Sequence, residues 1–266
     1  MSVLDLHIEG IGFWAPGWPN WDAAAAGLRG SAGPVEGAAA RPVPALLAPA
    51  ERRRAPDPVL LACEVALQAC AAAGRDAQEM ASVFASTHGD LVITDYMCAT
   101  LASAPMELSP IRFHNSVHNA PAGYWTIATH CHAPSTSISA WHASFAAGLF
   151  EAAVQAVSSD SPVMLAAYDT PSIGPLQGVS PSDTLFGVAL VIAPFVDGSA
   201  LSRLRLRMAA SEPAESAALP AAFAALAAAN PMAANSLAFL HALVSARRQT
   251  IRLDAGSGTM LAVEFC

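Results

Sequence analysis

Apolar and polar positions alternate with two different periods along this chain. In residues 3–13 they alternate one by one, which predicts a half-buried strand. Residues 57–73 carry apolar side chains at helical spacing, with Asp57 in a capping position and Gly74 as the stop. Residues 82–86 then form a short apolar strand that ends in the turn sequence THGD. Strands that alternate with helices in this way predict a layered α/β domain.

The same alternation continues to the end of the chain. Residues 140–158 are apolar around nearly the whole helical circumference, which predicts a buried helix. Residues 27–50, rich in Gly, Pro and Ala, show neither period and predict a surface loop. We further expect a helix at 95–104, buried strands at 163–167 and 186–192, an edge strand with alternating Leu and Arg at 201–208, helices at 212–229 and 235–246, and a hairpin formed by 251–253 and 260–265.

Composition excludes several classes of function. The formal net charge of −8 argues against a nucleic-acid partner, because phosphate binding needs a dense cationic face. All 13 basic residues are arginine. The chain therefore has no Schiff-base lysine, no lysine for a Walker-type phosphate loop and no lysine general base. Hydrophobic residues make up 54% of the sequence, which is ample material for the core of one large domain.

Cysteine usage and the terminal sequence bear on the compartment. The five cysteines form no CxxC pair and indicate no disulfide framework. The N-terminal sequence MSVLDLHIEG is acidic where a signal peptide would be cationic. No apolar run approaches ~20 residues without a polar interruption. We therefore expect a cytoplasmic protein with no membrane span and no cofactor.

Residues 109–150 are the most informative stretch of the sequence. We expect a conformationally rigid loop, a β-branched strand at 135–139 and a helix that begins near Ala140. A strand, a tight turn and a helix N-terminus together expose a nucleophile and favour negative charge beside it. The stretch resembles the β-ketoacyl synthase family, in which an Asn-x-x-Ala-Gly segment is followed by Pro-Ser-x-Ser. The residues that match in register are Asn119, Ala122, Gly123, Pro134, Ser135 and Ser137.

The resemblance covers most of residues 3–195 and implies a fold. The helix at 57–73, the strand at 82–86, the strand VMLAAYD and the segment TLFGVALVIAP follow the order of the family. The resemblance implies an α/β, thiolase-like fold that corresponds to the N-terminal half of a ketoacyl synthase, a layered sheet with helices and a truncated second half. We expect residues 1–200 to form this half. Residues 201–266 would be a short C-terminal extension of strands and helices that completes the same domain.

The resemblance fails at the catalytic residues. By register, the nucleophilic cysteine of the family falls on His142. One histidine, His241, follows Ala200 where the family has two active-site histidines, and the family's active-site lysine has no counterpart. An acyl-imidazole hydrolyses readily, so His142 does not replace a thiolate nucleophile. We expect no catalytic residue here and no Claisen condensation by this chain alone.

Within the family, chain-length factors have this profile, because they are degenerate subunits that pair with an active ketosynthase. The phrase SPIRFHNSVHNAPAGYW and the segment at 230–233 resemble the short factors of aryl-polyene and xanthomonadin-type pigment clusters. The resemblance implies a non-catalytic subunit that shapes the acyl tunnel in polyketide or aryl-polyene (fatty-acid-like) chain elongation on acyl carrier protein. It implies a heterodimer with the ketosynthase, and leaves direct contact with the carrier protein open.

The same resemblance implies which residues meet the partner. The strand at 135–139 would pair with the partner's equivalent strand across a twofold axis. Side chains between residues 109 and 119 would reach the acyl tunnel, where a bulky residue stops chain growth early and a small one lengthens the product. The candidate tunnel and interface residues are Arg112, Phe113, Ser116, Val117, Asn119, Ser135 and Ser137.

Alternative interpretations stay open. A stand-alone malonyl decarboxylase or thioesterase-like enzyme would use His142 or Cys131 and need an open polar pocket. A self-associating scaffold would pair the strand at 135–139 with its own copy. We favour His142 as a plug that fills the former cysteine pocket. His114 and His118 are four residues apart, but no acidic residue accompanies them, so we expect no metal site.

Two further features have structural and functional interpretations. Asp169 follows a buried strand, where a turn-capping role is favoured over that of a catalytic acid. Arg203, Arg205 and Arg207 form a stripe that is typical of the solvated face of an edge strand. The same stripe could dock an acidic carrier protein.

Overall fold

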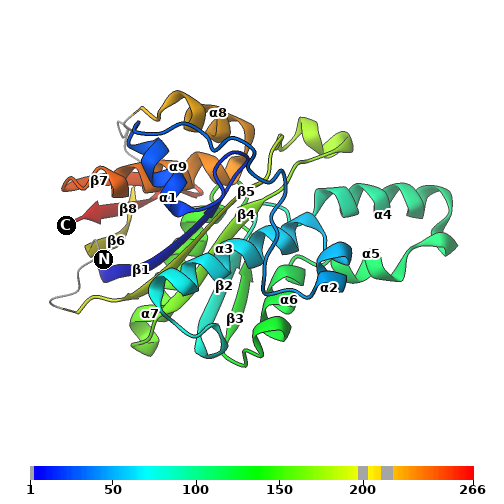
Figure 1. Cartoon of the computed structure of the whole chain (residues 1–266), viewed down its shortest axis with the longest axis horizontal. Helices are drawn as coiled ribbons and strands as arrows, with labels where there is room; N and C mark the ends of the chain where they lie inside the picture. The colour runs from blue at the N-terminus through cyan, green and yellow to red at the C-terminus, as the bar shows by residue number, and fades with distance from the viewer. Residues whose placement is uncertain (1–2, 197–202, 211–217) are drawn as a thin grey trace.

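One mixed sheet organises the chain (Figure 1). The computed structural model describes residues 3–196, 203–210 and 218–266. Within these ranges the strands lie in the order β3-β2-β4-β5-β1-β6-β8-β7. β2 is parallel to β3 and β4, and all other neighbours are antiparallel. The strands are β1 (Leu4–Trp14), β2 (Ala81–Ala85), β3 (Ser135–Ile138), β4 (Val163–Asp169), β5 (Phe186–Pro194), β6 (Arg203–Ala210), β7 (Gln249–Gly256) and β8 (Thr259–Phe265).

Helices cover both faces of the sheet. The α-helices are α1 (Trp21–Leu28), α2 (Pro49–Arg54), α3 (Asp57–Ala73), α4 (Leu91–Ser103), α5 (Pro110–Asn115), α6 (Ala120–Thr129), α7 (Ser144–Ser159), α8 (Ala221–Ala229) and α9 (Pro231–Val244). Three short 3-10 helices lie at Ala77–Glu79, Pro105–Glu107 and Gly174–Gly178. None of the helices in the described ranges has the length and apolarity that a membrane crossing requires.

Alternating strand residues divide the core between two helical layers. Met164 and Val191 point to the face that α3 covers, while their neighbours Leu165 and Leu190 point to the face that α7 and α9 cover. All four side chains are fully buried. This is the pattern of strands with apolar side chains on both faces, which explains why β4 and β5 read as continuous apolar runs in the sequence.

Helix α3 lies unusually close to β1. A Cβ atom added to Gly12 would lie 1.9 Å from the Val65 carbonyl oxygen, and one added to Gly10 would lie 2.2 Å from the Ala69 oxygen. No side chain fits in this space, so the two glycines allow the helix backbone to rest directly on the strand. The helix ends at Gly74 in the left-handed conformation (φ 63°), as predicted, but its N-cap is Pro56, and Asp57 lies in the first turn.

Most of the predicted strands are confirmed, and so is the C-terminal hairpin of β7 and β8. The prediction of an edge strand at 201–208 is wrong, since β6 pairs with β1 on one side and with β8 on the other. Leu204 and Leu206 are fully buried against the core, which an inner strand requires. Residues 201–202 of the predicted strand and residues 212–217 of the predicted helix at 212–229 lie outside the described residues.

The segment before β3 also differs from the prediction. Residues 110–115 and 120–129 form the helices α5 and α6, not a rigid loop. The helix after β3 begins at Ser144, four residues later than expected. Residues 21–28, of which 27–28 belonged to a predicted loop, form α1. Helices α4 and α5 project away from the sheet as an arm (Figure 1).

Candidate functional site

A tight, strained turn joins β3 to α7. Trp141 has a φ of 54°, in the left-handed region that a bulky side chain rarely adopts. The Ser144 hydroxyl closes the turn, because it donates a hydrogen bond to the Trp141 carbonyl (2.6 Å) and accepts one from the Ala140 amide (2.9 Å). Such strain is stored where surrounding structure enforces it, and it is common at functional sites. The turn therefore retains the form of a nucleophile elbow.

His142 occupies the exposed tip of this elbow. Its side chain is exposed, and its ring centroid lies 5.2 Å from that of Trp141. Its backbone carbonyl accepts a hydrogen bond from Asn235 Nδ2 of α9 (2.9 Å). The interpretation of His142 as a plug of a buried pocket is wrong, since an exposed imidazole fills no interior space. The elbow presents an imidazole to its surroundings.

Two further histidines approach the elbow from other segments. His88, in the turn after β2, packs edge-on against Trp141, with 4.8 Å between ring centroids. Burial lowers the pKa of His88, and proximity to His142 and His118 lowers it further. His88 Nε2 is buried and has no hydrogen-bond partner among the described residues. His118 Nε2 lies 3.1 Å from the Ser86 carbonyl oxygen.

A buried carboxylate holds the turn after β2 in place. Asp169, at the end of β4, accepts hydrogen bonds from the Ser86 hydroxyl (3.0 Å), the Thr87 amide (2.8 Å) and the Thr87 hydroxyl (2.5 Å). Complete burial raises the pKa of Asp169 to about 6, and these donors oppose that rise. The Thr87 carbonyl in turn accepts a hydrogen bond from Ser139 Oγ (2.8 Å). Asp169 therefore ties the turn after β2 to the elbow through Ser139, which is a positioning role.

Three of the candidate tunnel residues line one hollow. Phe113, Val117 and Asn119 border a hollow of about 540 Å³ between α2, α5 and α6. The rest of its lining is mainly apolar and comes from Leu47, Glu51, His114, Ala120, Gly123, Tyr124, Ile127 and Ala128. Phe113 and Val117 keep 57% and 49% of their surface exposed. Both side chains are therefore available to an apolar ligand or partner.

The other two candidates in this segment are engaged locally. The guanidinium carbon of Arg112 lies 3.9 Å from the centre of the Tyr96 ring, which is a cation–π contact. Ser116 Oγ donates a hydrogen bond to the Phe113 carbonyl (2.8 Å). Neither residue is part of the lining of the hollow. The structure thus separates the five predicted residues of this segment into two groups.

Ser135 and Ser137 lie on the edge strand β3. Among the described strands β3 pairs only with β2, so its other edge is unpaired. Ser135 Oγ accepts a hydrogen bond from Ser82 Oγ (3.1 Å), and Ser137 faces Phe84 in the register. An unpaired edge offers its N–H and C=O groups to a strand of another chain.

Sequence reasoning missed a set of exposed apolar side chains on α4, α5, α6 and the segments that join these helices. We call it the arm surface, and it includes Val92, Leu101, Met106, Ile111, Phe113, Val117 and Ile127. Met106 is 95% exposed and Ile127 is 73% exposed. Phe113, Val117 and Ile127 border the same hollow, and apolar side chains that are exposed together normally mark an interface. The helix that carries Ile111 and Phe113 was not recognised, because a loop was predicted for the segment that contains α5.

The histidines do not make a metal site in the part of the chain that the structure describes. No group of three His, Cys, Asp or Glu side chains there has a geometry suited to a metal ion. His114 instead borders the hollow of α5 and α6. Cys131 is buried, with its thiol 3.5 Å from the Met80 carbonyl, and His241 borders a different hollow together with Leu28 and Arg29.

The chain matches the family model described as "Beta-ketoacyl synthase, N-terminal domain" over residues 18–257. Among curated protein sequences, no relative matches it. Among solved structures it is similar to a chain of a ketosynthase (ApeO) in complex with its chain length factor (ApeC) from Xenorhabdus doucetiae. That similarity has a TM-score of 0.72 and 23% identity over 98% of this chain and 99% of the other.

Two further structures are similar over the same extent. A chain of the ishigamide ketosynthase/chain length factor aligns with a TM-score of 0.69 and 14% identity, over 98% of this chain and 99% of that one. A chain of the AntDE:AntF assembly, a type II PKS acyl-carrier protein in complex with its ketosynthase, aligns with a TM-score of 0.71 and 11% identity, over 99% of both chains. The predicted thiolase-like ketosynthase fold is confirmed.

Proposed function

Because this chain belongs to the β-ketoacyl synthase N-terminal-domain family, we propose that it is a chain-length factor, a non-catalytic subunit that pairs with an active ketosynthase. One observation carries the proposal. The strained elbow of the family is retained, but an exposed His142 stands at the position of the nucleophile. A subunit that keeps the scaffold and lacks the thiolate has no acyl acceptor of its own.

The lengths of similar chains support the short, partner-dependent form. This chain covers 99% of the chains that it matches in the two ketosynthase/chain length factor structures. It covers only 45% of ketosynthase twelve from the bacillaene polyketide synthase and 37% of the module 6 ketosynthase of that pathway. We also propose that residues 201–266 complete the same domain, since β6, β8 and β7 extend the sheet outward from β1.

Two surfaces of the chain suit a ketosynthase partner. The unpaired edge of β3 can extend the sheet across a dimer axis by main-chain hydrogen bonds. The arm surface supplies apolar area beside the β3 edge, because α6 contacts β3 and also lines the hollow that Phe113 and Val117 border. A stable interface needs about 800 Å² from each partner, which a four-residue strand alone does not provide.

In this proposal the hollow between α2, α5 and α6 contributes to the acyl tunnel. Phe113 and Val117 would limit the length of the growing chain, while Arg112 and Ser116 hold the shape of α5 through local contacts. The substrate would be an acyl chain of the polyketide or aryl-polyene type, carried by an acyl carrier protein in the cytoplasm. The mainly apolar lining of the hollow suits an apolar acyl chain better than a polar one.

An elongation assay with malonyl-loaded carrier protein tests the proposal. The purified chain alone should release neither carbon dioxide nor product, whereas the complex with its ketosynthase should elongate. His142→Ala should leave the rate of the complex within about twofold of the unsubstituted rate, because no step uses that imidazole. Decarboxylation or thioester hydrolysis by the isolated chain, abolished by His142→Ala, would show instead the stand-alone enzyme.

A further inference from the structure

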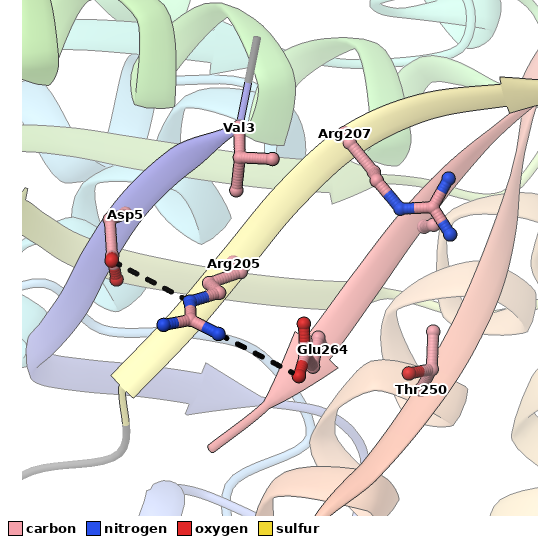
Figure 2. A pocket seen from close by; sticks show the side chains of 7 residues that line it. Val3, Asp5, Arg205, Arg207, Thr250 and Glu264 are labelled. Carbon is pink, nitrogen blue, oxygen red and sulfur yellow. Dashed lines mark ion pairs between the residues drawn. The ribbon is translucent and has the colours of Figure 1, made fainter. Parts of the chain in front are cut away.

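At the end of the sheet opposite β3, strand β6 carries a row of arginines. They lie on the face of the sheet that points away from α7 and α9. On β6, Arg203, Arg205 and Arg207 alternate with buried leucines, so all three side chains point to this face. Figure 2 shows Arg205 between Asp5 of β1 and Glu264 of β8, with Arg207 farther along β6 and Thr250 on the neighbouring β7. The opposite face of these strands packs on α7 and α9 through Leu253, Leu261 and Val263.

Two carboxylates of this face, Asp5 and Glu264, pair with arginines of β6. Arg203 makes two hydrogen bonds to Asp5, and these lower the pKa of the Asp5 carboxyl. Arg205 lies between Asp5 (3.6 Å) and Glu264 (4.0 Å), as the dashed lines in Figure 2 show. This network fixes the arginine side chains in place before any partner arrives.

Two exposed arginines of the same face are not part of this network. Arg207 and Arg248, which directly precedes β7, have no carboxylate within 4.0 Å in the described ranges. Arg207 and Arg248 border two hollows of about 410 and 440 Å³ that share Arg205, Thr250 and Glu264, and so form one trough. The trough is thus cationic at both ends, on a chain whose net charge is −8.

We propose that this trough docks an acidic helix of the acyl carrier protein. The identity of the partner rests on the proposed function. The position of the docking site on this chain rests on charge complementarity. The trough lies at the end of the sheet opposite the β3 edge, so a carrier protein and a ketosynthase could occupy the chain together. Carboxylates would meet Arg207 and Arg248, while the network of Arg205 keeps the floor of the trough rigid.

The spacing of the two arginines suits a helix. From the strand register, Arg207 and Arg248 are four residues apart along the strands and two strands apart across them. Strand dimensions place them about 16 Å apart. A helix rises about 16 Å over 11 residues, and residues 11 apart lie on the same helical face. Two carboxylates at that spacing on one helix would therefore each reach an arginine.

A titration with an apo acyl carrier protein purified from the host tests the inference. The apo form lacks the phosphopantetheine arm, so its affinity reports docking at the surface and not entry into a tunnel. The full chain is titrated alone and as the ketosynthase complex, at low and at raised salt. The double variant Arg207→Glu/Arg248→Glu should weaken the affinity about tenfold or more, and Arg207→Lys/Arg248→Lys should restore most of it. Arg54→Glu, an exposed arginine of α2, is the matched control and should change nothing.

The outcomes separate this inference from the proposed function. A charge-reversed double variant that binds the carrier as the unsubstituted chain does, or an unsubstituted chain that binds no carrier, would overturn the inference. The inference would also be overturned if the double variant lost binding to phosphatidylglycerol vesicles while its affinity for the carrier protein stayed unchanged. The trough would then be a lipid site. Since the variants leave the β3 edge and the arm surface intact, the ketosynthase should still co-purify with them. If no ketosynthase co-purified with the unsubstituted chain either, that result would contradict the proposed function and not the docking of the carrier protein.

Discussion

Asp169 accepts hydrogen bonds from both the backbone amide and the hydroxyl of Thr87, at 2.8 and 2.5 Å, inside the protein. These bonds fasten the end of β4 to the turn after β2, and that turn carries His88 against the elbow. The arrangement keeps a nucleophile elbow in shape although no thiolate is present there.

Removal of the Asp169 carboxylate should destabilise the fold. Asp169→Ala leaves three buried donors of Ser86 and Thr87 without an acceptor, so the free energy of unfolding should fall by about 3 kcal/mol. Urea unfolding followed by circular dichroism measures the change. Glu79→Ala, an exposed acid, should change it by less than about 0.5 kcal/mol. Equal effects of the two substitutions would argue against the positioning role of Asp169.

The same carboxylate should make stability depend on pH. Burial raises the pKa of Asp169 from 3.8 to about 6, so between these values the folded state holds more protons than the unfolded state. The free energy of unfolding contributed by Asp169 therefore falls as pH rises from 4 to 6, by about 3 kcal/mol, and stays level above pH 6.

Asp169→Asn isolates this contribution, because its amide does not titrate. The difference in unfolding free energy between the unsubstituted chain and the variant should decrease from pH 4 to pH 6. Asp5 and Glu9, whose pKa values are lowered by arginine, have the opposite dependence, but they are present in both proteins and cancel. A difference that is constant with pH would mean that Asp169 stays ionised throughout.

Gly12 should tolerate no side chain. A Cβ there would lie 1.9 Å from the Val65 carbonyl oxygen, so Gly12→Ala must push α3 away from β1. We expect a loss of several kcal/mol in unfolding free energy or failure to fold. Gly33→Ala is the matched control, because nothing lies within 4 Å of the added atom. A stable Gly12→Ala protein with unchanged melting temperature would contradict the close packing of α3.

The arm surface should be required for pairing and not for folding. Ile127 is 73% exposed on α6, so Ile127→Asp should leave thermal unfolding unchanged and abolish co-purification of the ketosynthase. Val196→Asp is the control, since Val196 is 65% exposed and follows β5 beside the start of β1, away from β3. Retention of the ketosynthase by Ile127→Asp would place the interface elsewhere.

Phe113 should limit the length of the product. In the ketosynthase complex, Phe113→Ala enlarges the hollow and should shift the product distribution toward longer chains, measured by mass spectrometry of carrier-bound acyl groups. Ile111→Ala removes a side chain that is equally exposed on α5 and outside the hollow, and should leave the distribution unchanged. If the two variants gave the same distribution, the hollow would not be part of the tunnel.

The sheet could be predicted from the sequence to a large extent, because β2, β4 and β5 are short apolar runs with buried side chains on both faces. Helices α5 and α6 were not predicted, because a rigid loop was expected before β3 and each helix carries a proline, Pro110 or Pro121, near its start. Both prolines stand in the first turn of their helix, where a missing N–H costs nothing. The Leu–Arg alternation of β6 suggested an edge, but β6 is an inner strand, and Asp5 of the neighbouring strand β1 pairs with Arg203 and Arg205.

The site was predictable only in part. The elbow and the position of His142 follow from local sequence, whereas the contacts of His88 with Trp141 and of Asp169 with Thr87 join segments more than 50 residues apart. Such contacts depend on the order of the strands, which no local pattern contains. The sequence THGD after β2 was the one available signal for His88, and it indicated only a turn.

The mass of the native complex tests the central claim most directly. The tagged chain is purified from its host under native conditions, and the eluted species is weighed intact by mass spectrometry. The proposal predicts one copy of this 27.3 kDa chain with one copy of a ketosynthase that carries the catalytic cysteine. A homodimer or a lone monomer, with no ketosynthase at any recovered mass, would contradict it.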